Sequence, residues 1–64
     1  MRDDVKNALI KFENKHFSAV QTDTELGLCD NDARYVSLER KAKQFWADCK
    51  AARDELTALL EKIA

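Results

Sequence analysis

The second half of the chain carries an unbroken hydrophobic repeat, and this repeat restricts the possible folds more than any other feature. From Tyr35 to Ile63, apolar or nearly apolar residues recur at alternating steps of three and four. This spacing places them on one stripe of a long helix and matches the a/d pattern of a coiled coil. The a positions are Tyr35, Ala42, Cys49, Leu56 and Ile63, and the d positions are Leu38, Phe45, Ala52 and Leu59. We therefore predict a helix over about residues 32–63 whose coiled-coil-like seam packs against another helix.

A shorter repeat in the first part of the chain predicts another helix, over about residues 3–20. Its stripe consists of Val5, Leu9, Phe12, His16 and Ala19. Asp3 and Asp4 precede this stripe, where carboxylates cap free N–H groups and complement the helix dipole. Ile10 and Phe17 lie seven residues apart and well off the stripe. They predict a second apolar spot that a single partner helix leaves uncovered.

The periodicity lapses over residues 21–31, which we interpret as a capped linker. The segment from Thr22 to Gly27 has the Thr-x-x-Glu spacing of a capping box, which predicts a single helical turn that Gly27 closes. The following Asp30-Asn31-Asp32 offers alternative N-caps for the second helix.

Composition agrees with an all-α fold. The chain has 64 residues, no proline and one glycine, and hairpin turns and phosphate-binding loops both depend on glycine. We predict one helical domain over residues 1–64, an all-α helical hairpin with a short first helix and a long second helix. A chain this short buries only about 60% of the surface that its unfolded state exposes, so its core is thin.

The predicted helix lengths differ, which singles out one end of the hairpin. At 1.5 Å per residue the first helix spans roughly 27 Å and the second roughly 48 Å, so the first shields only about two-thirds of the second. The residues left bare are candidates for partner binding: Leu56, Leu59, Leu60 and Ile63. Three arrangements would cover them: two hairpins pairing into a four-helix bundle, a different protein docking there, or the long helix bending back on itself.

A basic stripe beside the seam is the second candidate binding feature. Lys43, Trp46, Lys50 and Arg53 follow one another at steps of three, four and three, which sets them on one helical face. Tryptophan and arginine are enriched at binding hot spots, and a basic stripe with an aromatic residue also suits phosphate contact with base stacking. The plainer interpretation is that Trp46 covers the edge of a narrow core while the lysines keep that face soluble.

Charge limits the nucleic-acid interpretation. Residues 1–32 contain four Lys/Arg and seven Asp/Glu, whereas residues 33–64 contain seven and five, so the halves carry charges of −3 and +2. Nucleic-acid-binding domains usually carry far more positive charge than this chain, whose isoelectric point is near 5.7. A dimer could still concentrate two basic stripes on one face.

The residue types that support catalysis are sparse. His16 is the only histidine, and no serine, cysteine or second histidine stands beside it at catalytic or ligand spacing. Its place on the apolar stripe favours a packing role, although a distant pairing with Cys29 or Cys49 stays open. The acidic residues of the linker lack the EF-hand pattern and are better explained as helix caps. We therefore expect no catalytic residues, no metal site and no cofactor.

Together these patterns predict a small interaction protein rather than an enzyme. We expect a soluble, cytoplasmic adaptor, inhibitor or regulator that binds a larger protein through its second helix, with another protein or a second copy as partner and no membrane contact. The alternative is a dimeric helical-hairpin regulator that binds RNA or DNA through the Lys43, Trp46, Lys50 and Arg53 stripe. No stretch approaches the roughly 20 apolar residues that span a bilayer.

Overall fold

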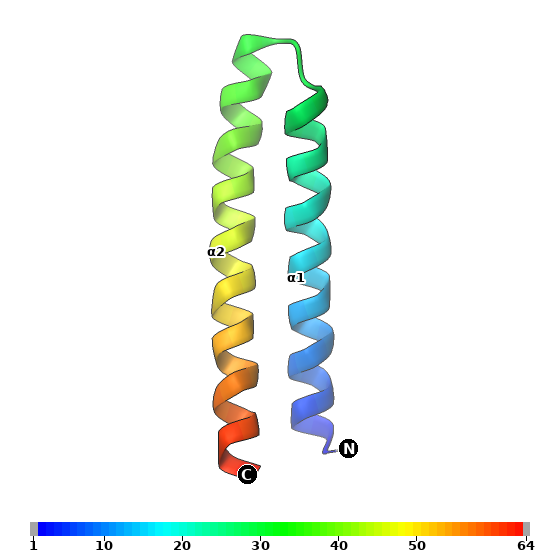
Figure 1. Ribbon diagram of the computed structural model, residues 1–64, viewed down its shortest axis with the longest axis vertical. Coiled ribbons are helices and arrows are strands. Elements are labelled where there is room, and N and C mark those ends of the chain that lie inside the picture. Colours follow the sequence, from blue (N-terminus) through cyan, green and yellow to red (C-terminus); the bar gives the residue numbers. More distant parts are fainter. Residues whose placement is uncertain (1, 64) are drawn as a thin grey trace.

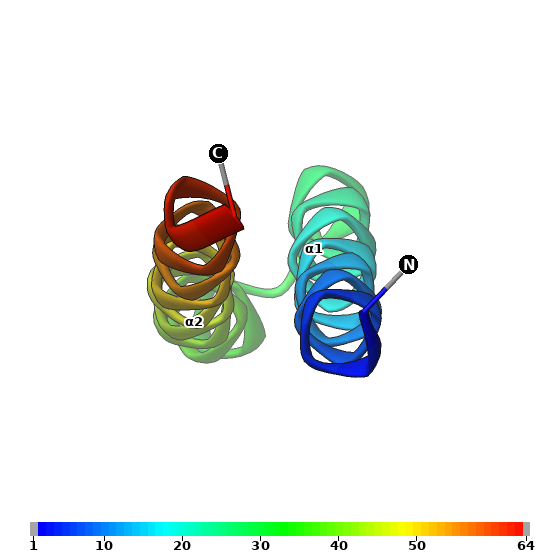
Figure 2. The same ribbon diagram turned by 90° about the horizontal axis from the view of Figure 1, so that it is seen from below.

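Two antiparallel helices joined by a short connection make up the structure (Figure 1). The structure is a computed structural model that describes residues 2–63; Met1 and Ala64, the ends of the predicted domain, lie outside the described residues. Helix α1 spans Asp3–Leu28 and helix α2 spans Asp32–Ile63. Helix α1 begins and α2 ends at the same end of the hairpin, and the view from below shows the two helices tilted relative to one another (Figure 2). The predicted all-α helical hairpin is confirmed.

Helix α2 has the bounds that its hydrophobic repeat predicts. It begins after Asn31, whose side-chain Oδ1 accepts a 3.0 Å hydrogen bond from the backbone N–H of Arg34. Asn31 is therefore the N-cap among the three candidates in this segment. Asp32 in the first turn and Lys62 in the last turn complement the helix dipole.

Helix α1 is longer than the sequence predicts. The prediction of a capped linker over residues 21–31 is therefore wrong for most of that range. The hydroxyls of Thr22 and Thr24 donate to the carbonyls of Ser18 and Val20 four residues earlier, at 2.9 and 3.0 Å. They therefore continue the helix instead of capping a new turn. Gly27 lies inside the helix without a positive φ. The helix ends one residue later, where the N–H of Cys29 bonds to the carbonyl of Leu26.

Small side chains make up most of the core between the two helices. The buried residues are Val5, Ala8, Ala19 and Thr22 of α1 and Leu38, Ala42, Cys49 and Ala52 of α2. No large side chain is fully buried within residues 2–63. Because a buried alanine removes little apolar area from water, this core supplies little hydrophobic stabilisation. Tyr35 and Ile63 occupy a positions of the seam yet are 42% and 49% exposed, because each lies at an end of the helix pair.

Because α1 is longer than predicted, the prediction that it leaves the end of α2 bare is wrong for two of the four residues concerned. With 26 residues in α1 and 32 in α2, the helices are about 39 and 48 Å long, so α1 covers most of its partner. Leu56 and Leu59 are consequently half-buried between the helices. Leu60 and Ile63 alone of the four predicted residues remain about half exposed, at 49% each.

The hairpin exposes more surface than a compact protein of its size. Its accessible area is 4927 Å², compared with the roughly 4,200 Å² typical of a folded 7.3 kDa monomer. The excess follows from an elongated shape that is only two helices wide, with Cα extents of 47 × 15 × 12 Å. Within residues 2–63, neither helix has an apolar stretch long enough to cross a membrane.

Candidate interaction surface

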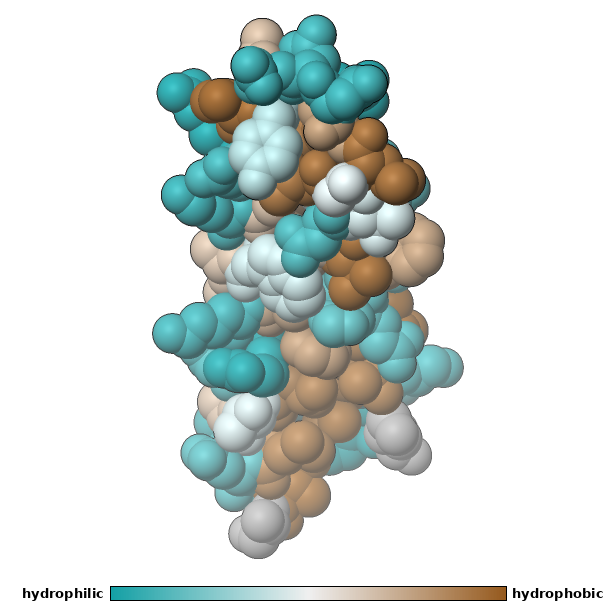
Figure 3. All heavy atoms as spheres, turned by 45° about the horizontal axis from the view of Figure 1, so that its top comes forward, coloured by the Kyte–Doolittle hydropathy of each residue, from teal (hydrophilic) through white to brown (hydrophobic). Residues whose placement is uncertain are grey.

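The two broad sides of the hairpin differ in chemistry. One side is held by the 3.0 Å ion pair between Lys11 and Glu55, with Lys15 and Asp48 close by, and is polar. The opposite side carries Phe12, His16 and Trp46 around a shallow recess. We call this opposite side the aromatic face. Figure 3 shows hydrophobic side chains following the line between the helices on this face, with hydrophilic side chains along the left edge and both kinds along the right edge.

Trp46 and Asp23 join the helices in the middle of the aromatic face. The indole Nε1 donates a 2.8 Å hydrogen bond to Oδ2 of Asp23. Trp46 remains 38% exposed, so the ring is oriented by this bond while part of its surface stays open to solvent. A fixed and partly exposed tryptophan is a typical anchor for a binding partner, because its large contact area loses little conformational freedom on binding.

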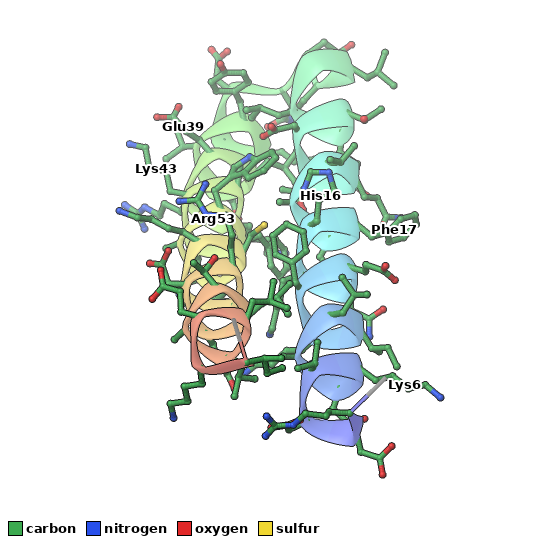
Figure 4. The ribbon with its side chains drawn as sticks, turned by 60° about the horizontal axis from the view of Figure 1, so that its bottom comes forward. Lys6, His16, Phe17, Glu39, Lys43 and Arg53 are labelled. Carbon is green, nitrogen blue, oxygen red and sulfur yellow. The ribbon has the colours of Figure 1, made fainter. Side chains whose placement is uncertain are left out.

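His16 lies against two aromatic rings at the exposed rim of the interface. Its ring centroid is 6.0 Å from that of Phe12 in a stacked arrangement and 5.7 Å from that of Trp46 in an edge arrangement. The predicted packing role at the rim of the core is confirmed by these contacts. Figure 4 shows the imidazole on the same side of the hairpin as Arg53.

His16 also meets Cys49, a pairing that the sequence leaves open. Sγ of Cys49 lies 3.9 Å from Nδ1 of His16, at the long end of a sulfur hydrogen bond. Cys49 is 6% exposed, so the imidazole lies over a thiol that water reaches poorly. The two residues are 33 positions apart, and only the pairing of the helices brings them together.

The predicted basic stripe is only partly assembled into one site. Trp46, Lys50 and Arg53 line the recess of about 260 Å³ together with Phe12, His16 and Cys49. Lys43 lies outside this recess and pairs with Glu39 at 3.4 Å. Arg53 also has a carboxylate nearby, since its Nε is 3.8 Å from Oδ1 of Asp54. The positive charge of the stripe is therefore partly neutralised within the chain.

Further exposed apolar residues extend the aromatic face along both helices. On α1, Val20 follows His16 by four residues, so it lies on the same side of the helix as His16. On α2, Tyr35 and Leu60 lie 11 and 14 residues from Trp46, which places both on the same side as Trp46. All three are more than 40% exposed. Tyr35 belongs to the predicted seam and Leu60 to the predicted apolar end. Val20 was missed, because it is the last residue of the helix predicted over residues 3–20 and is not a member of the stripe that the spacing indicates.

The second apolar spot on α1 is confirmed. Ile10 is 44% and Phe17 is 68% exposed, and Figure 4 shows Phe17 pointing away from α2. The spot lies on the outer edge of α1, next to the aromatic face. It therefore widens the apolar surface on the α1 side of the hairpin.

Metal-ligating side chains are dispersed. Within residues 2–63, no three side chains of His, Cys, Asp or Glu come together in a group that could hold a metal ion. Asp23 is engaged by Trp46, and Cys29 and Cys49 are both free thiols. Comparisons of the chain with models of protein families, with curated proteins and with solved structures gave no match.

Proposed function

We propose that this chain is a small non-enzymatic interaction protein that binds another protein through its aromatic face. The observation that carries the proposal is the composition of that face: partly exposed Trp46 beside Arg53, and partly exposed Tyr35 further along the same side of α2, on a hairpin whose own core contains no fully buried large side chain. Trp, Tyr and Arg are the residue types that dominate binding energy in protein interfaces. An adaptor, inhibitor or regulator of the cytoplasm is the class of protein that this surface suits.

The predicted residues contribute unequally to this proposal. Trp46, Lys50 and Arg53 line the recess, and Leu60 and Ile63 add apolar surface toward the end of α2. Leu56 and Leu59 serve the hairpin itself, since they are half-buried between the helices. A substitution at Leu59 would therefore report on folding as much as on binding, and Leu60 is the better position for a test.

Binding of RNA or DNA is the less favoured alternative, for a reason specific to this surface. The aromatic ring best placed for base stacking is Trp46, and its indole is held by the carboxylate of Asp23. Lys43 and Arg53 each have an acidic neighbour as well. A phosphate backbone approaching the stripe would meet these three carboxylates, which reduces the electrostatic attraction on which such binding depends.

Affinity capture from the native lysate with matched variants tests the proposed function. Trp46→Ala and Leu60→Asp should lose the bound protein, whereas Ala51→Asp should retain it, because Ala51 is exposed and lies on the opposite, polar side with Lys15 and Asp48. Circular dichroism should show all three variants to be helical. Equal capture by the wild type and by both face variants would reject the proposal. Binding of nucleic acid that weakens steeply with salt would favour the alternative.

A further inference from the structure

The aromatic face has a shape and charge pattern that a second copy of this chain would complement. We infer that two hairpins pack through their aromatic faces into a four-helix bundle, with both interhelical connections at the same end and α1 of each copy lying over α2 of the other. This inference rests on the proposed function, because it names the partner of the same surface. A two-fold symmetric pairing uses one self-complementary patch twice, so each contact occurs in duplicate.

The area of the face fits a stable dimer. The Cα trace covers 47 by 15 Å in its two longest directions, and Figure 1 shows this broad side with both helices next to each other. The product of these two extents is about 700 Å², close to the roughly 800 Å² that each partner buries in an interface of standard size. Covering this face would also remove the excess accessible surface of the isolated hairpin and give four helices a shared core.

The middle parts of the two edges of the aromatic face carry opposite charge. Along α1, Glu13 lies one residue after Phe12 and seven before Val20, and Asp23 contacts Trp46. Along α2, Lys43 and Lys50 flank Trp46 in sequence, and Arg53 lines the recess. Glu39 on this edge of α2 is paired with Lys43. Lys6, seven residues before Glu13, adds a positive charge to the α1 edge toward its N-terminal end, so only the part of this edge from Glu13 to Asp23 is acidic. Over the matching part of α2, Lys43, Lys50 and Arg53 outnumber Glu39 and Asp54, so that part is basic.

The heights of these charges along the hairpin match as well. The ion pair of Lys11 with Glu55 sets the register between the helices, so Glu13 lies level with Arg53, and Asp23 lies level with Lys43. A two-fold axis parallel to the long axis keeps every residue at its own height and lays α1 over the partner's α2. Glu13 then approaches the partner's Arg53, and Asp23 approaches the partner's Lys43. Val20 meets the partner's Trp46 at the same level, so apolar contact and charge pairing coincide.

The opposite arrangement, with the two connections at different ends, conflicts with the charges. An axis across the hairpin lays α1 over the partner's α1 and α2 over the partner's α2. That axis inverts the heights, so Glu13 no longer approaches the partner's Arg53 and Asp23 no longer approaches the partner's Lys43. It also lays the basic residues of α2 over those of the partner's α2, where like charges repel. These contacts therefore favour the arrangement in which the connections lie together.

Solution mass and one distance test the inference. Analytical ultracentrifugation across concentration should show a dimer of the 7.3 kDa chain. In a Cys49→Ala background, nitroxide labels on Cys29, in the connection between the helices, should lie far closer together than the 47 Å length of the hairpin. A separation near that length would overturn the arrangement. A monomer at every concentration would overturn the second copy as partner, while the capture experiment with Trp46→Ala still tests the proposed function independently.

Charge reversal adds a direct test of the pairing. Glu13→Lys should weaken dimerisation by roughly tenfold, because two symmetry-related contacts become repulsive at once. Combining it with Arg53→Glu should restore most of the loss. Glu25→Lys is the matched control, since Glu25 is also an exposed carboxylate of α1 but lies away from the aromatic face. A dimer that tolerates Glu13→Lys as well as Glu25→Lys would overturn the proposed pairing.

Discussion

The indole Nε1 of Trp46 donates a 2.8 Å hydrogen bond to Oδ2 of Asp23 and thereby connects the middle of α2 to the last two turns of α1. These two residues are 23 positions apart. Their bond is one of three contacts through which polar side chains of the two helices meet within residues 2–63, together with Lys11–Glu55 and His16–Cys49. It therefore helps to set the register between helices whose buried residues are small.

Removing the indole donor should weaken the hairpin modestly. Trp46→Phe keeps an aromatic ring but cannot bond to Asp23, so we expect a loss of about 1 kcal/mol in the free energy of unfolding. Urea unfolding followed by circular dichroism, at one fixed protein concentration, measures this loss. A double-mutant cycle with Asp23→Ala isolates the bond, and a coupling energy indistinguishable from zero would show that the bond contributes nothing in solution.

Gly27→Ala should stabilise the protein. Gly27 lies within α1 without a positive φ, and an added Cβ would meet no atom within 4 Å. Alanine is favoured over glycine in a helix by about 0.5–1 kcal/mol, which raises the Tm of a domain of this size by several degrees. Thermal unfolding measures the shift. A fall in Tm would instead indicate that Gly27 closes the helix with a left-handed conformation.

Enlarging a buried alanine between the helices should be costly. Ala52 is only 2% exposed, so Ala52→Leu forces the helices apart and should destabilise the fold by about 1–3 kcal/mol. Ala47→Leu is the control, because Ala47 is exposed on α2 and its substitution should change stability by less than about 0.5 kcal/mol. Equal effects of the two substitutions on urea unfolding would contradict the burial of Ala52.

The two thiols should react at very different rates. Cys29 lies half-buried in the connection, whereas Cys49 is 6% exposed beneath His16. With an aromatic disulfide reagent, the thiolate of Cys29 should attack and release one coloured thiolate per chain quickly. Cys49 should react only as the helices open, and both thiols should react rapidly in denaturant. Cys29→Ser identifies the fast thiol, and a fast reaction that survives this substitution would contradict the burial of Cys49.

Much of the hairpin was predictable from local spacing. The three-four repeat of α2 predicts its range, and Asn31 is one of the caps that the sequence offers. The end of α1 was not predictable in this way, because threonine hydroxyls can either cap a new turn or bond back to the preceding turn. In Thr22 and Thr24 they bond back, and α1 continues to Leu28.

The candidate surface was less predictable than the fold. The stripe of Trp46, Lys50 and Arg53 follows from helical spacing alone, because its members share one helix. Contacts between helices depend on the register, which a shift of a few residues in the connection would change. No pattern in the sequence therefore indicates that Asp23 meets Trp46 or that His16 covers Cys49.

Three contacts between polar side chains join the two helices, and they close loops of increasing length. Trp46 with Asp23, Cys49 with His16, and Lys11 with Glu55 are separated by 23, 33 and 44 residues of chain. Closing a shorter loop costs less chain entropy, so the contact nearest the connection, Trp46 with Asp23, forms most readily during refolding. Its formation brings the residues of the next contact closer together. The reverse order holds when the chain is held by its two ends and stretched. Because α1 begins and α2 ends at the same end of the hairpin, tension loads the contact between Lys11 and Glu55 before the other two, and the helices separate toward the connection one turn at a time.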